Sequence, residues 1–180
     1  MDFDKEELDK CIISVAGSHA SETLDSIFER KKKDISSNGS TYWVANIRKK
    51  DRDLISNDKN LKVIFVKGAS KNSTKNTKKS CVATHSSIDG NTWKELLNSL
   101  SPVTGNVNNR KQITLKLKEL ETIDSMEIDL NDYENLKFSN NCSTCLAERK
   151  KNNSKNNPNS RRVLAIGTLE GLEYVKKIER

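Results

Sequence analysis

Apolar positions near the start of the chain recur at a helical spacing. The pattern across residues 4–16 follows i, i+3, i+4 and i+7, which predicts an amphipathic helix. Its apolar members are Leu8, Cys11, Ile12 and Val15. A second helix is predicted from Ser21, a suitable N-cap residue, to about Lys33. The sequence SSNG at residues 36–39 predicts a turn after it.

Runs of β-branched and alternating apolar residues predict strands through the rest of the chain. The predicted strands are Ser40–Lys49, Leu61–Lys67, Lys79–Ser86, Ile113–Leu117, Met126–Leu130 and Arg162–Gly167. We expect a hairpin across Glu121–Ser125, a helix over Thr92–Leu100, and either a closing helix or the return arm of a hairpin over Leu169–Ile178. These elements predict an α+β fold, with an antiparallel sheet of about five or six strands and flanking helices.

The order of these elements divides the chain into three parts. Residues 1–20 are expected to hold the N-terminal helix, and residues 21–105 a basic core with the order α-β-β-β-α. Residues 106–180 are expected to add further strands, a basic Asn/Lys-rich loop and a C-terminal strand and helix. A length of 180 residues fits a single domain, so we expect this last part to pack on the same domain.

Composition changes this picture in two ways. Only 33% of the residues are hydrophobic, below the roughly 45–50% of typical globular domains, so the core is expected to be modest. No apolar run approaches the roughly 20 residues that span a bilayer, and the acidic N-terminus does not resemble a signal peptide. We therefore expect no membrane insertion, a location in the cytoplasm or nucleus, and four reduced cysteines.

Positive charge is concentrated in one part of the chain. The net charge is +7, but residues 30–79 hold fifteen Lys or Arg and four Asp, a net charge of +11. A one-sided excess of this kind is typical of surfaces that bind a phosphate backbone. The alternative, that these lysines only keep solvated loops soluble, stays open at this point.

Few residues suggest catalytic or metal chemistry. The sequence contains no phosphate-binding glycine loop, nucleophile elbow or HExxH motif, so we expect neither an enzyme nor a cofactor. Cys142 and Cys145 form a CxxC pair, which supplies half of a zinc site. Cys81 and His85 are the remaining ligand candidates, although their spacing on a strand suits zinc poorly. We expect no metal, with a zinc site or a redox dithiol as open alternatives.

Three strand-like sequences and a helix follow one another in the basic part of the chain. They read GSTYWVANIRK at 39–49, LKVIFVKG at 61–68 and KKSCVAT at 78–84, followed by a helix with WKELL at 93–97. In this order, residues 21–101 resemble the larger subunit of the Alu-domain heterodimer of the signal recognition particle. That family has an α-β-β-β-α fold and binds the Alu part of the particle's RNA through a basic sheet surface and a lysine-rich loop.

The resemblance implies a location for the RNA contacts in this chain. The matching strand end carries Arg48, Lys49 and Lys50, and the matching loop is Ser70–Lys79. The lysines of that loop are Lys71, Lys75, Lys78 and Lys79. We expect a non-enzymatic RNA-binding subunit of a ribonucleoprotein that contacts the phosphates of a structured RNA, with a hetero-oligomeric protein partner and no small-molecule substrate.

The alternative function is a protein scaffold or assembly factor that does not contact RNA. Two fainter resemblances point to it. Residues Arg162–Ile178 are similar to the closing hairpin of the small structural subunit of the tRNA-splicing endonuclease, and Val163–Ile166 is similar to a strand of the small proteasome-assembly chaperones. An uncovered apolar sheet face, for example at Ile113, Leu115 and Leu117, would favour this alternative.

Overall fold

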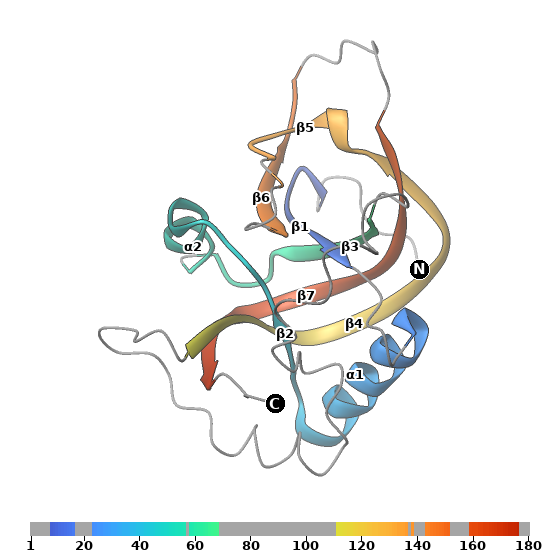
Figure 1. Ribbon diagram of the computed structural model, residues 1–180, viewed down its shortest axis with the longest axis vertical. Helices are drawn as coiled ribbons and strands as arrows, with labels where there is room; N and C mark the ends of the chain where they lie inside the picture. The colour runs from blue at the N-terminus through green and yellow to red at the C-terminus, as the bar shows by residue number, and fades with distance from the viewer. Residues whose placement is uncertain are drawn as a thin grey trace, which may run out of the picture.

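In the part of the chain that the structure describes, seven strands form one mixed sheet with the order β2-β4-β7-β3-β1-β6-β5 (Figure 1). The computed structural model describes residues 8–16, 23–56, 58–68, 111–136, 138, 143–151 and 159–176. The strands are β1 (Lys10–Ala16), β2 (Thr41–Val44), β3 (Lys62–Lys67), β4 (Lys111–Asp129), β5 (Tyr133–Glu134), β6 (Thr144–Arg149) and β7 (Ser160–Lys176). The helices are α1 (Leu24–Asn38), α2 (Lys49–Ile55) and the short 3-10 helix η3 (Leu130–Asp132).

The predicted mixture of helices and strands is confirmed, but the predicted sheet is wrong in two respects. Within the described residues it has seven strands instead of five or six, and the pairing of β1 with β3 is parallel, whereas the other strand pairs are antiparallel. Strands from both sides of residue 105, the predicted boundary between two parts of the chain, are interleaved in this sheet. Strands β4 and β7 of the last part lie between β2 and β3. The predicted strand Lys79–Ser86, the loop before it and the helix Thr92–Leu100 lie outside the described residues.

The first segment is a strand, so the helix predicted over residues 4–16 is wrong in the described part. Cys11, Ile12 and Ile13 are fully buried in β1. Ile12 packs into one hydrophobic cluster and Ile13 into another, on opposite faces of the sheet. A short apolar run buried on both faces is typical of a central strand and overrides a helical spacing that rests on only four positions.

Helix α1 begins and ends later than predicted. Its N-cap is Thr23, whose hydroxyl accepts a hydrogen bond from the Ser26 amide at 3.2 Å. The segment 36–38, predicted as a turn, continues the helix. Gly39 then ends it with a left-handed φ of 80°, and its amide donates to the Ile35 carbonyl at 2.8 Å. The predicted turn is therefore a helix C-terminus.

Strands β4 and β7 are unusually long and pair with each other along their length (Figure 1). The predicted hairpin across Glu121–Ser125 is wrong, because β4 runs through this segment and a bulge between Thr122 and Met126 takes up the extra residues. The closing helix or return arm predicted over Leu169–Ile178 is also wrong as far as Lys176, where β7 ends. Gly167 permits the close pairing, since a Cβ there would lie 3.1 Å from the Glu119 carbonyl.

The sheet curls until its distant strands meet. Strands β2 and β3 are three positions apart, which is about 14 Å in a flat sheet. The rings of Trp43 on β2 and Phe65 on β3 nevertheless have centroids only 4.5 Å apart. Beyond β2, the Asn46 carbonyl accepts a hydrogen bond from the Thr144 amide of β6 at 3.3 Å. The sheet is therefore close to a closed barrel around its larger hydrophobic cluster.

Buried charges of α1 cover the edge of β2. The carbonyl of Tyr42 faces away from β4 and accepts a hydrogen bond from the ammonium of Lys31, which is only 2% exposed. Asp34 lies one helical turn further on and accepts a hydrogen bond from the Thr41 hydroxyl at 3.3 Å. Burial raises the pKa of Asp34, and the positive charge of Lys31 and the Thr41 hydrogen bond oppose this rise without cancelling it.

Asp34→Asn is expected to increase the free energy of unfolding at neutral pH. Because folding raises the pKa of Asp34, this carboxyl favours folding below its unfolded pKa, and that contribution is lost as pH rises through the folded pKa. Asparagine keeps an acceptor for Thr41 without the buried charge. Urea unfolding should show a gain at neutral pH that disappears near about pH 3, below the ordinary Asp pKa. A loss at neutral pH would mean that attraction to Lys31 outweighs burial.

Candidate nucleic-acid interface

The structure describes three of the seven residues predicted to contact RNA. Arg48, Lys49 and Lys50 lie at the start of α2 instead of along a strand, so the prediction of a strand over Ser40–Lys49 is wrong beyond Val44. Strand β2 ends at Val44 and α2 follows, with Arg48 at its N-cap and the Asp51 side chain of its first turn buried. The other four predicted residues, Lys71, Lys75, Lys78 and Lys79, lie outside the described residues.

A partly buried ion pair and its hydrogen bonds hold α2 against the sheet. The carboxylate of Asp51, a residue only 2% exposed, accepts hydrogen bonds from Arg48 Nε at 3.2 Å and from Arg48 Nη2 at 3.0 Å. It also accepts from the backbone amide of Leu146, on the outer edge of β6, at 3.3 Å. Arg48 Nη2 donates further to the carbonyl of Asn135 at 2.9 Å. The guanidinium of Arg48 is therefore largely occupied by contacts within the protein.

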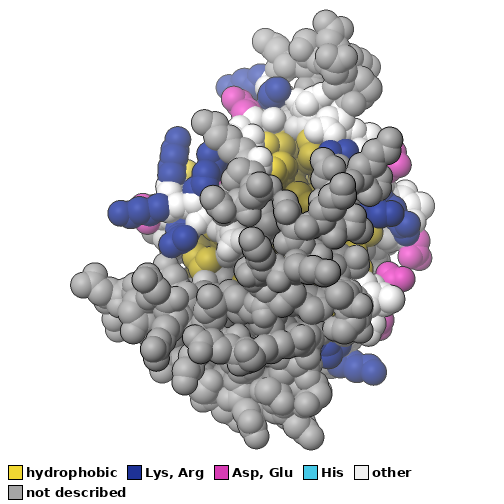
Figure 2. Space-filling model, viewed as in Figure 1, with side chains coloured by type: hydrophobic (Ala, Val, Ile, Leu, Met, Phe, Trp, Pro, Cys, Tyr) yellow, Lys and Arg dark blue, Asp and Glu magenta, His cyan; other side chains and the backbone are white. Residues whose placement is uncertain are grey.

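Lys49, Lys50 and Asp53 are the exposed charged residues of this helix, and the two lysines carry its exposed positive charges. In the part of the chain that the structure describes, neither ammonium has an ion pair or a hydrogen bond. Figure 2 shows Lys and Arg side chains gathered over α2, at the left of the molecule. Arg52 is half-buried and donates from Nε to the Ile47 carbonyl at 2.8 Å, which ties the helix to the segment that precedes it. The helix therefore presents two solvated ammonium groups on a firmly held backbone.

A small pocket lies between this helix and the β5–β6 edge. Its volume is about 270 Å³. Its lining comprises Arg48, Lys50, Asp51 and Leu54 from the α2 segment, Leu146 and Glu148 from β6, and Asn135 from beyond β5. Leu54 is 47% exposed and is the one exposed large hydrophobic residue in the described ranges. The sequence pointed to Arg48 and Lys50 but gave no signal for Glu148, Leu54 or Asn135, which the fold brings to the pocket.

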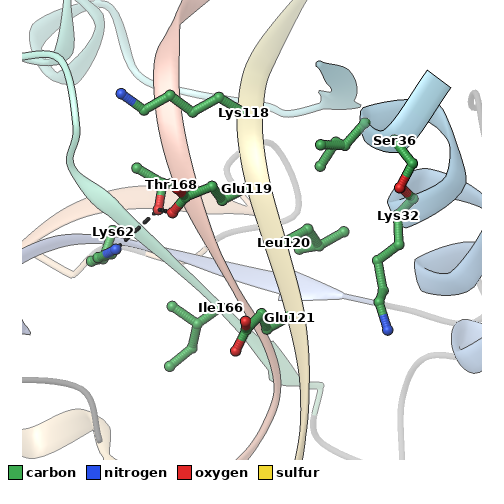
Figure 3. Close-up of a pocket in the computed structure, with 10 residues that line it drawn as sticks. Lys32, Ser36, Lys62, Lys118, Glu119, Leu120, Glu121, Ile166 and Thr168 are labelled. Atoms are coloured by element: carbon green, nitrogen blue, oxygen red, sulfur yellow. Dashed lines mark hydrogen bonds between the residues drawn. The ribbon is translucent and has the colours of Figure 1, made fainter. Parts of the chain in front are cut away.

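A larger pocket of about 400 Å³ lies between α1 and the middle of the sheet (Figure 3). Its sheet side holds a polar chain across three strands. Lys62 of β3 donates to the Thr168 hydroxyl of β7 at 3.0 Å, and that hydroxyl lies 3.0 Å from Glu119 of β4. Each of these three side chains is hydrogen-bonded to its neighbour, which is the pattern of a stabilising network across strands.

The described cysteines do not form a reactive or metal-binding site. Cys11 and Cys145 are both fully buried free thiols. Burial raises the pKa of Cys11 to about 12, so its thiol stays protonated at neutral pH. In the described residues, no group of three or more His, Cys, Asp or Glu side chains is placed to hold a metal ion. Cys142, Cys81 and His85 of the zinc alternative lie outside those residues.

Comparisons with known proteins add no family to this geometry. No protein-family model matches the chain, and searches of curated proteins and of solved structures found no significant match. Within the described ranges, neither helix has the length and apolar character needed to cross a membrane. The site is therefore interpreted from its own residues.

Proposed function

We propose that this chain is a non-enzymatic RNA-binding subunit of a ribonucleoprotein and that α2 forms part of its phosphate-contacting surface. The main support is the pair of exposed ammonium groups of Lys49 and Lys50 on a helix anchored by the buried carboxylate of Asp51. A lysine ammonium contacts a backbone phosphate as a point charge, so such a pair suits binding of an RNA strand. The lysines of the loop Ser70–Lys79 are proposed to extend this surface.

The basic segment supports RNA over a small anionic ligand. Its net charge of +11 spans 50 residues, from Arg30 to Lys79. A charge of this size distributed along 50 residues matches a polyanion, because an RNA strand releases its bound counterions when it binds a basic protein surface. We propose a location in the cytoplasm or nucleus, where such an RNA is found. The narrower hypothesis, that the RNA belongs to a signal recognition particle, rests on the resemblance of residues 21–101 alone.

Removing the two charges of Lys49 and Lys50 is expected to weaken RNA binding and reduce its salt dependence. If each contacts one phosphate of a single strand, the log–log slope of affinity against salt should fall by about 1.4 in the double alanine variant. Both side chains are exposed, so the fold should be unaffected. Filter binding of a mixed-sequence, single-stranded RNA at several salt concentrations measures the slope.

The matched control removes the same charge from another helix of the same basic segment. Lys32→Ala with Lys33→Ala lowers the net charge equally but acts on α1, which Figure 1 places away from α2. This control should leave the slope nearly unchanged. Equal losses in both double variants would mean that charge alone attracts RNA and that α2 is not a localised site. No measurable binding by the wild-type chain would defeat the proposed function itself.

The scaffold alternative is not favoured by the described sheet. Ile113, Leu115 and Leu117, the example given for an uncovered apolar face, are 7%, 0% and 0% exposed. They pack in the larger hydrophobic cluster, on the inner side of the curled sheet. In the described ranges, Leu54 is the one large apolar side chain offered to a partner, and it stands beside the basic helix surface.

A further inference from the structure

The pocket beside α2 combines charges that phosphate binding does not explain. Lys50 lines it from the helix and Glu148 lines it from β6. The Glu148 side chain is exposed and has no hydrogen bond or ion pair to any described residue. A carboxylate repels phosphate, so a surface that bound only the RNA backbone would be weakened by this residue. Its presence points to a ligand group that donates hydrogen bonds.

We propose that this pocket binds a guanine base of single-stranded RNA, an inference that rests on the proposed RNA-binding function. An ionised carboxylate is an acceptor with two oxygens. Guanine presents two adjacent donors on its Watson–Crick edge, the N1–H and the N2 amino group, which match these two oxygens. RNA-binding proteins commonly read unstacked bases on this edge.

The basic side chains of the pocket lining suit the acceptor atoms of the same base. Guanine carries two acceptors, O6 and N7, which pair with basic side chains. Lys50 supplies an ammonium there, and Arg48 is held nearby by Asp51. Adenine, cytosine and uracil each lack the pair of adjacent donors, so a carboxylate in this lining discriminates in favour of guanine.

The size and the apolar part of the pocket agree with a single base. A volume of about 270 Å³ lies just below the roughly 300–1,000 Å³ of pockets for drug-sized ligands. Leu54, 47% exposed, offers an apolar surface against which a ring face can pack. Lys49, the preceding residue on α2, remains outside the lining and is available for the flanking phosphate.

The test compares short single-stranded RNAs in binding to the full chain. The probes are oligouridine, oligouridine with one central guanosine, and the same oligomer with inosine, which lacks the N2 amino group. We expect the guanosine oligomer to bind about tenfold more tightly than oligouridine and the inosine oligomer to lose most of that gain. Glu148→Gln should abolish the guanosine preference while binding oligouridine equally or slightly more tightly.

Two further variants separate this proposal from the proposed function. Glu134→Gln changes the exposed residue that pairs with Glu148 across β5 and β6 but does not line the pocket, so it should keep the preference. Lys49→Ala should weaken all three probes equally. Binding without a guanosine preference, or equal loss of preference in both glutamine variants, would overturn the guanine pocket and leave RNA binding intact. No binding of any probe would overturn both.

Discussion

Phe65→Ala is expected to lower the free energy of unfolding by about 3–5 kcal/mol, the largest effect of any single substitution considered for this chain. Phe65 is fully buried in β3. Its ring centroid lies 4.5 Å from that of Trp43 on β2 and 5.5 Å from that of Phe28 on α1. Alanine would remove a contact that joins two distant strands and a helix and would leave a cavity inside the curl of the sheet.

Urea unfolding followed by circular dichroism measures this loss. Phe65→Leu keeps much of the side-chain volume and should cost about 1.5 kcal/mol or less. Leu54→Ala removes an exposed apolar side chain and should change stability by about 0.5 kcal/mol at most. A small loss for Phe65→Ala would mean that the aromatic contacts do not hold the sheet in its curled form.

Local sequence patterns predicted those elements whose burial matches their pattern. The strand over Leu61–Lys67 is confirmed as β3. It has four consecutive buried residues and lies in the middle of the sheet, paired on both sides by β7 and β1. The strand over Arg162–Gly167 is confirmed as part of the longer β7. In each case a continuous run of β-branched and apolar residues has one stable solution, a strand buried on both faces.

Elements that depend on distant partners were not predictable from local patterns. The segment Lys10–Ala16 becomes a strand because β3 and β6, about 50 and 130 residues further along the chain, pair with it. The segment Glu121–Ser125 was predicted as a turn between two strands, yet the similarly long β7 supplies a partner on both sides of it. Propensity is a weak guide where tertiary pairing decides the outcome.

The same distinction applies to the candidate site. The sequence indicated Lys49 and Lys50 through local charge, and these residues are exposed on α2. Glu148 comes from a segment almost 100 residues away, and no local motif marks it. The bond from Arg48 to the Asn135 carbonyl likewise joins residues 87 positions apart. The basic character of the surface could be predicted, but the acidic residue in its pocket could not.

Asp51→Ala is expected to lower the free energy of unfolding by about 2–4 kcal/mol. The amide of Leu146 would be left buried without a partner, which costs about 1–3 kcal/mol. The ion pair with Arg48 adds less, about 1 kcal/mol, because the Arg48 side chain is 29% exposed and water can solvate its charge. Asp51→Asn keeps an acceptor for Leu146 and should lose less than the alanine variant.

The Asp51 variants also connect stability to the proposed interface. If this carboxylate fixes α2 on β6, then alanine should weaken RNA binding by the chain even under conditions where the sheet stays folded. Asp53→Ala, two residues further along α2 and exposed, is the control, with an expected change within about 0.5 kcal/mol. Far-ultraviolet circular dichroism measures the loss of stability and filter binding measures the loss of RNA affinity, and both are recorded on the same samples. Wild-type stability in Asp51→Ala would mean that other contacts close the β6 edge. If Asp51→Ala loses stability as expected but keeps its RNA affinity, the RNA contacts lie away from α2.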